Sequence, residues 1–105
     1  MATEFQEKLF NTIASIPEGR VSTYGHVARA VGAGGMARYI TSTMKSHPKF
    51  NMLPWHRVVY ADGTMWHAGM DNREERVEIF RNEGIEVTDE NKIVDFHEVL
   101  YTFED

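Results

Sequence analysis

The chain has 105 residues, a formal charge of −5 and no cysteine. We expect one small domain over residues 1–105, and the lack of cysteine excludes disulfides, thiolate zinc sites and thiol nucleophiles. The sequence begins without a basic flank and apolar run, and no apolar stretch approaches membrane length, so we expect no membrane partner and a cytoplasmic protein, nucleoid-associated if prokaryotic.

The amino-terminal half predicts three helices. Thr3 and Gln6 fit a capping box, and the apolar residues that follow at helical spacing predict a helix over residues 4–15. Ser22 and Thr23 are candidate caps for a second helix that closes at Gly32, and a third helix is expected from about residue 36 to residue 46. Two short helices around a glycine-rich turn predict a helix-turn-helix.

The carboxyl-terminal half predicts a hairpin and one more helix. The Asp62-Gly63 step lies between two β-favouring runs and predicts a β-hairpin over residues 58–66. A helix capped by Asp71 or Asn72 is expected to run to about residue 82 and to end at Gly84. Residues 85–105 predict only brief strands or turns, so the fold class is mostly α with a small β-hairpin.

Charge is distributed unevenly along the chain. From residue 19 to residue 61 there are six cations and no acid, whereas residues 62–105 carry four cations and thirteen acids. A stretch of 43 residues without a carboxylate suits a polyanionic partner, and chance asymmetry on a solvated surface is the alternative. The acidic segment is either a docking surface for other proteins or a solvated face.

Residues 54–58 form the most informative motif, Pro54-Trp55-His56-Arg57-Val58. It resembles the Pro-Cys-His-Arg-Val alkyl-acceptor motif of O6-alkylguanine-DNA alkyltransferases, with tryptophan in place of the reactive cysteine. Three further matches lie in register: residues 16–25, the pair Ala37-Arg38 and the pair Glu83-Gly84. An indole has no usable lone pair for attack on an alkyl carbon, so the chain resembles the non-catalytic alkyltransferase-like proteins over residues 4–85.

This resemblance implies a winged-helix-like helix-turn-helix domain that binds double-stranded DNA containing O6-alkylguanine. An O6-alkyl group removes the N1 proton of guanine and weakens its pairing, which lowers the cost of extruding the base. By resemblance, Tyr24 presses on the backbone and lines the pocket, while Arg38 enters the stack in place of the extruded base. The simpler alternatives are a surface ring for Tyr24 and a solvated helix charge for Arg38.

Other residues of the expected DNA site are small or hydroxylic. Gly34, Gly35 and Ala37 would let the recognition helix approach a minor groove closely, although Tyr39 and Thr41 depart from the small-residue pattern. We also assign to the expected DNA-binding set the two residues that precede Tyr24, namely Ser22 and Thr23.

Trp55 has two candidate roles by this resemblance: an aromatic wall beside the extruded base, or core filling. Pro54 would fix the turn that presents Trp55, and Val58 would add apolar pocket surface. The Tyr-Ser-Gly of the transferases is replaced by Ala68-Gly69-Met70, so the lesion loses a hydroxyl donor. We expect a roomier pocket that accepts bulky alkyl groups, with contributions from Met65, Trp66, Gly69 and Met70, and with His67 or Arg73 reaching in.

His56 and Glu83 match the pair that activates the thiol in the transferases. Without a thiol they are interpreted as a structural hydrogen-bonded pair, with Arg57 joining the motif to carbonyls or carboxylates. His47 stands where an asparagine commonly braces the active-site turn.

Three functions follow for comparison. The first is a non-enzymatic sensor that directs O6-alkylguanine to nucleotide excision repair proteins; the second is residual alkyltransferase or glycosylase activity; the third is a helix-turn-helix transcription regulator. We expect a monomer without a cofactor. We also expect no metal, since none of the five histidines pairs with another at i, i+3 or i, i+4.

Overall fold

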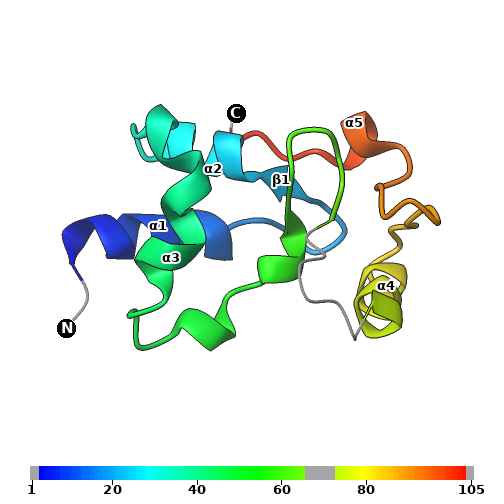
Figure 1. Ribbon diagram of the computed structural model, residues 1–105, viewed down its shortest axis with the longest axis horizontal. Coiled ribbons are helices and arrows are strands. Elements are labelled where there is room, and N and C mark those ends of the chain that lie inside the picture. The colour runs from blue at the N-terminus through cyan, green and yellow to red at the C-terminus, as the bar shows by residue number, and fades with distance from the viewer. Residues whose placement is uncertain (1–2, 66–72, 104–105) are drawn as a thin grey trace.

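The computed structural model describes residues 3–65 and 73–103 (Figure 1). Its helices are α1 (Glu4–Ala14), α2 (Tyr24–Ala30), α3 (Ile40–Met44), α4 (Arg73–Asn82) and α5 (Phe96–Val99), and its strands are β1 (Ser22–Thr23) and β2 (Val58–Val59). Three 3₁₀ turns complete the element order: η1 (Gly34–Tyr39), η2 (Phe50–Met52) and η3 (Trp55–Arg57). The fold is therefore mostly helical with a small sheet, as the sequence predicts. No helix in the described residues is long and apolar enough to cross a membrane.

Helix α1 begins where its capping box predicts. The Thr3 hydroxyl accepts a hydrogen bond from the Gln6 N–H, and the Gln6 side chain accepts one from the Thr3 N–H. Leu9 and Ile13 are one turn apart and fully buried, so the apolar stripe of α1 faces the core. The predicted helix over residues 4–15 is confirmed within one residue.

The second and third predicted helices have different outcomes. Helix α2 starts at its Thr23 cap and the chain turns at Gly32, whose φ of 76° suits glycine. The single helix expected over residues 36–46 is instead divided into the 3₁₀ turn η1 and the short helix α3. Neither begins with a side-chain cap, and the β-branched Ile40, Thr41 and Thr43 lower the helix propensity of this segment.

The two-stranded sheet is parallel and joins distant segments. Ser22 pairs with Val58 and Thr23 pairs with Val59. The Asp62-Gly63 turn does form, with the Tyr60 N–H donating to the Thr64 carbonyl at 2.9 Å. Thr64, however, forms an antiparallel bridge with Lys92, so the predicted hairpin is wrong in its strand partners. The reason is tertiary: β2 gains a fully buried partner in β1, which a local hairpin would not supply.

The sheet lies between two hydrophobic clusters. Val58 belongs to the cluster under α1, α2 and α3, whereas the neighbouring Val59 belongs to the cluster under α4 and the carboxyl-terminal segment. Successive strand residues point to opposite faces, so two adjacent valines supply both cores. The sheet thereby fixes the position of the helix-turn-helix segment, formed by α2, η1 and α3, relative to α4.

The carboxyl-terminal segment returns to the start of β1. The Val21 N–H donates to the Val99 carbonyl at 2.9 Å, and the Tyr101 N–H donates to the Val21 carbonyl. The Arg20 guanidinium also donates to the Val99 and Leu100 carbonyls. This part of the chain, for which the sequence predicts only brief elements, thus closes the second core.

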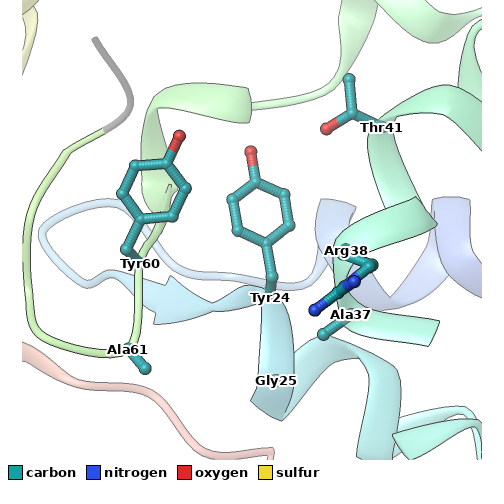
Figure 2. Close-up of a pocket in the computed structure, with 7 residues that line it drawn as sticks. All are labelled: Tyr24, Gly25, Ala37, Arg38, Thr41, Tyr60 and Ala61. Carbon is teal, nitrogen blue, oxygen red and sulfur yellow. The ribbon is translucent and has the colours of Figure 1, made fainter. Parts of the chain in front are cut away.

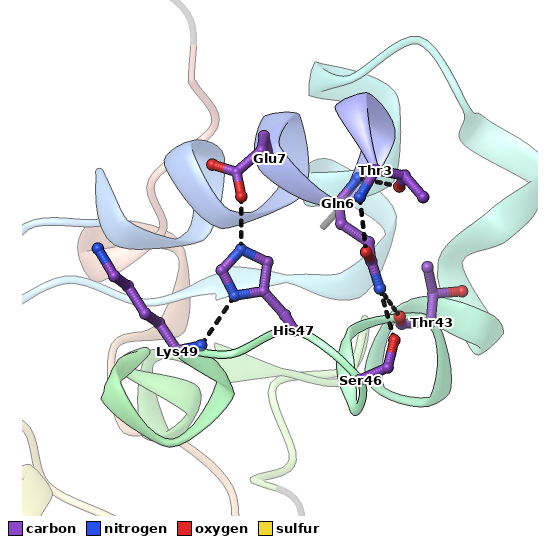
Figure 3. A network of polar contacts seen from close by, with 7 residues as sticks. All are labelled: Thr3, Gln6, Glu7, Thr43, Ser46, His47 and Lys49. Carbon is purple, nitrogen blue, oxygen red and sulfur yellow. Dashed lines mark hydrogen bonds and ion pairs between the residues drawn. The ribbon is translucent and has the colours of Figure 1, made fainter. Parts of the chain in front are cut away.

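A polar network fastens α1 to the end of α3 (Figure 3). The buried Gln6 amide donates to the Thr43 carbonyl at 2.9 Å and to the Ser46 hydroxyl at 2.8 Å. His47 contacts Glu7 through Nε2 at 2.8 Å and accepts the Lys49 N–H through Nδ1 at 3.0 Å. His47 therefore braces the loop that leads toward the pentapeptide.

Candidate functional site

The pentapeptide forms a 3₁₀ turn between the loop that follows α3 and strand β2. Pro54 precedes the turn, and the Trp55 indole N–H donates to the Phe50 carbonyl at 2.9 Å. The Trp55 and Phe50 rings pack with centroids 5.0 Å apart. The indole is thus half-buried and fixed in orientation at the position where the transferase motif has a thiol.

Glu83 holds the rest of the pentapeptide. Its carboxylate contacts His56 Nε2 at 2.6 Å and accepts two hydrogen bonds from the Arg57 guanidinium, each 3.0 Å long. Arg57 also donates to the Ile16 carbonyl at 3.0 Å, and the Gly19 N–H donates to Glu83 at 3.2 Å. The structure therefore contains the His56–Glu83 pair and the Arg57 contacts that the sequence predicts.

This carboxylate is ionised at neutral pH. Burial alone would raise the pKa of Glu83, but hydrogen bonds from Arg57 and His56 outweigh it and lower the pKa from 4.5 to about 2. The Glu83 side chain is only 8% exposed, so these bonds are poorly screened by water. The cluster is consequently a rigid, charge-compensated support for the pentapeptide.

A cavity of about 510 Å³ lies beside the helix-turn-helix segment formed by α2, η1 and α3. Figure 2 shows Tyr24 at its centre, with Arg38 on one side and Tyr60 on the other. The cavity is lined by Tyr24, Gly25, Ala37, Arg38, Thr41, Tyr60 and Ala61. The structure therefore brings together three predicted residues, Tyr24, Ala37 and Arg38.

Tyr24 carries a neutral phenol in this cavity. Burial raises the pKa of its phenol above 10.0, while the Thr41 side chain and the Arg76 charge act in the opposite direction. In Figure 2 the Thr41 hydroxyl lies close to the Tyr24 hydroxyl. Thr41, which stands where the family pattern has a small residue, thus places a polar group beside the Tyr24 phenol.

Trp55 does not line the Tyr24 cavity. It lines a separate cavity of about 210 Å³, together with Leu53, His56, Glu75, Arg76 and Ile79. Arg76 lines this second cavity, and its charge also acts to lower the pKa of Tyr24 in the first. Trp55 therefore packs against the core, which is one of its two expected roles, and it also lines this second cavity; a stacking contact with an extruded base stays a prediction.

Several predicted site residues lie in the core. Ser22, Thr23, Val58 and Met65 are each at most 3% exposed and do not line the Tyr24 cavity, so in this structure their side chains have a packing role and their part in DNA or lesion binding stays a prediction. Thr23 caps α2 and contacts His26, and Val58 and Met65 belong to different hydrophobic clusters. The pleat explains the burial of Ser22, Thr23 and Val58, because both strands are covered on both faces.

The remaining predicted residues divide into two groups. Gly35 is exposed on η1, where a side chain would meet open space. Arg73 donates to the Asn91 side chain and to the Thr88 carbonyl, and it lines a different cavity, on α4, so it does not reach into the Tyr24 cavity. Gly69, with Trp66, His67, Ala68 and Met70, lies outside the described residues.

Sequence reasoning missed Tyr60 as a member of the cavity. Its ring centroid is 6.1 Å from that of Tyr24, and the residue is 38% exposed. Predicting Tyr60 would have required the parallel pairing of β1 with β2. No local sequence pattern indicates that pairing.

Comparison with known proteins decides the family. Residues 4–85 match the family described as 6-O-methylguanine DNA methyltransferase, DNA binding domain. The chain is an alkyltransferase-like member of this family. It is 37% identical over 89 residues to the DNA base-flipping protein of Escherichia coli, covering 85% of this chain and 68% of that protein. It is 39% identical over 89 residues to alkyltransferase-like protein 1 of Schizosaccharomyces pombe, covering 80% and 79% of the two chains.

Solved structures agree with this assignment. The crystal structure of S. pombe Atl1 in complex with damaged DNA containing O6-carboxymethylguanine matches with a TM-score of 0.74 and 32% identity, over 96% of this chain and 98% of that chain. Mycobacterium tuberculosis O6-methylguanine methyltransferase matches with a TM-score of 0.59 and 27% identity, over 79% of this chain and 50% of that chain. The chain thus matches an alkyltransferase-like structure over nearly its whole length and a transferase over half of that protein's length.

Proposed function

We propose that this protein recognises O6-alkylguanine in double-stranded DNA, holds the damaged nucleotide extruded from the helix, and leaves the lesion chemically unchanged. The observation that carries the proposal is that Trp55 occupies the position of the acceptor cysteine in a chain without any cysteine. Its indole N–H is bonded to the Phe50 carbonyl. A thiolate could accept an alkyl group at this seat, whereas an indole N–H can only donate or stack.

The arrangement of His56 supports a non-enzymatic role. Its Nε2 is 2.6 Å from the Glu83 carboxylate, which also receives Arg57. In a transferase this pair would serve a neighbouring thiol, but here the neighbour is the indole of Trp55. The pair then acts as a support that keeps the pentapeptide in shape.

Charge supports DNA as the partner. Arg20, Arg29, Arg38, Lys45 and Lys49 are exposed, while Arg57 is neutralised by Glu83. Five exposed cations in a stretch without acids suit a phosphate backbone despite the negative total charge. The relatives named for base flipping, and the similar structure bound to damaged DNA, point to the same partner.

Base extrusion accounts for the Tyr24 cavity. Arg38 lies exposed at its side, so its planar guanidinium can enter the gap left by an extruded base, stack there and donate to the orphaned cytosine. Tyr24 can press on the backbone from the centre of the cavity. The small residues of η1 permit close approach to a minor groove.

Repair in this scheme has to come from other proteins, because no step of the proposal alters the alkyl group. A protein that stabilises an extruded base in a distorted duplex marks the site for a system that removes an oligonucleotide. We propose nucleotide excision repair proteins as the partners that follow.

Binding to matched duplexes with and without one O6-methylguanine tests the proposal. Wild-type protein should prefer the damaged duplex, and Tyr24→Phe, Arg38→Ala and Trp55→Ala should each reduce that preference. After incubation with radiolabelled alkylated DNA, no label should appear on the protein or as free base. Label transfer would establish an enzyme, and equal affinity for both duplexes with preference for one sequence would establish a transcription regulator.

A further inference from the structure

Tyr60 and Tyr24 occupy equivalent positions at the carboxyl ends of the two strands. Thr23 pairs with Val59 in the parallel register, and the two tyrosines are the next residue along each strand. Their ring centroids are 6.1 Å apart with 36° between the ring planes, within the range of packed aromatic pairs. The sheet thus sets a second ring beside the first.

The backbone beneath Tyr60 is fixed. The Tyr60 N–H donates to the Thr64 carbonyl, and its carbonyl accepts the Gly63 N–H, each at 2.9 Å. Gly63 has a φ of 86°, and a side chain there would meet the Phe96 ring at 3.1 Å. Phe96 therefore packs against the turn, and the Tyr60 ring extends from a turn whose backbone is held in place.

Tyr60 is also open to solvent, although its neighbours on β2 are fully buried. It is 38% exposed, and it forms the wall of the Tyr24 cavity opposite Arg38 (Figure 2). The described lining of this cavity offers two aromatic rings and one guanidinium, which are the side chains that stack on nucleobases and sugars.

We propose that Tyr60 is a second DNA-contacting aromatic residue, whose ring face packs against the nucleotide beside the extruded one on the damaged strand. This inference rests on the proposed function and adds a residue to it. Tyr60 lies on the side of Tyr24 opposite Arg38 (Figure 2), so with Arg38 inside the duplex the Tyr60 ring would face the neighbouring nucleotide. The contact is made by the ring, so the Tyr60 hydroxyl contributes little.

Affinities of Tyr60→Ala and Tyr60→Phe for an O6-methylguanine duplex and its undamaged match test the proposal. Tyr60→Ala should bind the damaged duplex about 5-fold or more weakly than wild type, the lower end of a base-stacking contact. Tyr60→Phe should stay within about 2-fold of wild type. The control Met52→Ala, at a residue that is 75% exposed and outside the cavity, should bind like wild type.

A double-mutant cycle separates DNA contact from support of Tyr24. At low salt, where weakened complexes remain measurable, Tyr60→Ala should still cost about 5-fold in a Tyr24→Ala background. No further loss in that background, or a Tyr60→Phe variant as weak as Tyr60→Ala, would overturn the ring contact. If wild type binds both duplexes equally, the proposed function fails; if wild type discriminates and Tyr60→Ala binds the damaged duplex as tightly as wild type, only the Tyr60 proposal fails.

Discussion

Arg38 and Trp55 show how two residues of the family pattern are used differently. Arg38 is exposed at the edge of the Tyr24 cavity, where its guanidinium can leave the protein surface and enter DNA. Trp55 is half-buried, and its indole N–H donates a hydrogen bond to the Phe50 carbonyl. A substitution at Arg38 should therefore change DNA binding, whereas one at Trp55 should also change the stability of the fold.

We expect Arg38→Ala to weaken binding to an O6-methylguanine duplex by about 10-fold, through loss of a stacked group in the duplex. Arg38→Lys should not restore it, since an ammonium has no planar face. The free energy of unfolding should change by less than about 0.5 kcal/mol, as for other exposed positions. Fluorescence anisotropy and urea unfolding measure the two quantities, and full binding by Arg38→Lys would show that charge alone is sufficient.

Trp55→Phe should cost about 1 kcal/mol of folding stability, because the Phe50 carbonyl loses its indole donor while most of the ring packing remains. Thermal unfolding of this variant beside Phe50→Leu, which keeps the carbonyl, separates the hydrogen bond from ring packing. A Trp55→Phe protein as stable as wild type would mean that water replaces the indole at this carbonyl.

Among the elements, α1 and α3 depend on each other. Helix α3 has only five residues and begins without a side-chain cap, so an isolated α3 would be unstable. Gln6 compensates by bonding across to Thr43 and Ser46 while it completes the cap of α1. The position of α3 therefore depends on Gln6, which lies 37 and 40 positions before the two residues that it bonds.

Gln6→Ala should destabilise the protein by about 2 kcal/mol, because it removes half of the capping box and leaves the Thr43 carbonyl and the Ser46 hydroxyl without this partner. Asn11→Ala, on the exposed face of the same helix, is the matched control and should change stability little. Urea unfolding followed by circular dichroism measures both. A Gln6→Ala protein as stable as the control would show that α3 is held by apolar contacts alone.

At the scale of the whole molecule, Glu83 joins three segments that are far apart in sequence. It receives the Gly19 N–H before β1, His56 and Arg57 of the pentapeptide, and it lies just beyond the end of α4. Its pKa of about 2 in the folded state is below the usual 4.5, so folding favours the ionised form. This contribution is fully present above pH 4.5 and is lost as the pH falls toward 2.

Glu83→Gln should therefore lose stability on the order of 3 kcal/mol at pH 7, and its deficit relative to wild type should shrink as the pH falls from about 4.5 to about 2. Glu78→Gln is the matched control on α4, since Glu78 pairs with Arg81 at the surface and both side chains are more than half exposed. Urea unfolding at pH 7 and pH 3 compares the three proteins. If the stability deficit of Glu83→Gln stayed constant with pH, the ionised Glu83 carboxylate would not be the stabilising group.

The amino-acid sequence by itself determined the local features. The cap at Thr3, the cap at Thr23 and the turn at Gly32 were predicted because the side chains and backbone that form them lie within a few residues of each other. The pentapeptide was equally readable, since the loss of a nucleophile at Trp55 is a matter of residue chemistry.

Only the tertiary structure decided which residues meet in the cavity. Pairing of residues 22–23 with residues 58–59 buried Ser22, Thr23 and Val58, brought Tyr60 beside Tyr24, and gave Trp55 a cavity of its own. Local propensity does not contain such pairings, because their free energy comes from apolar surface buried between segments more than thirty residues apart.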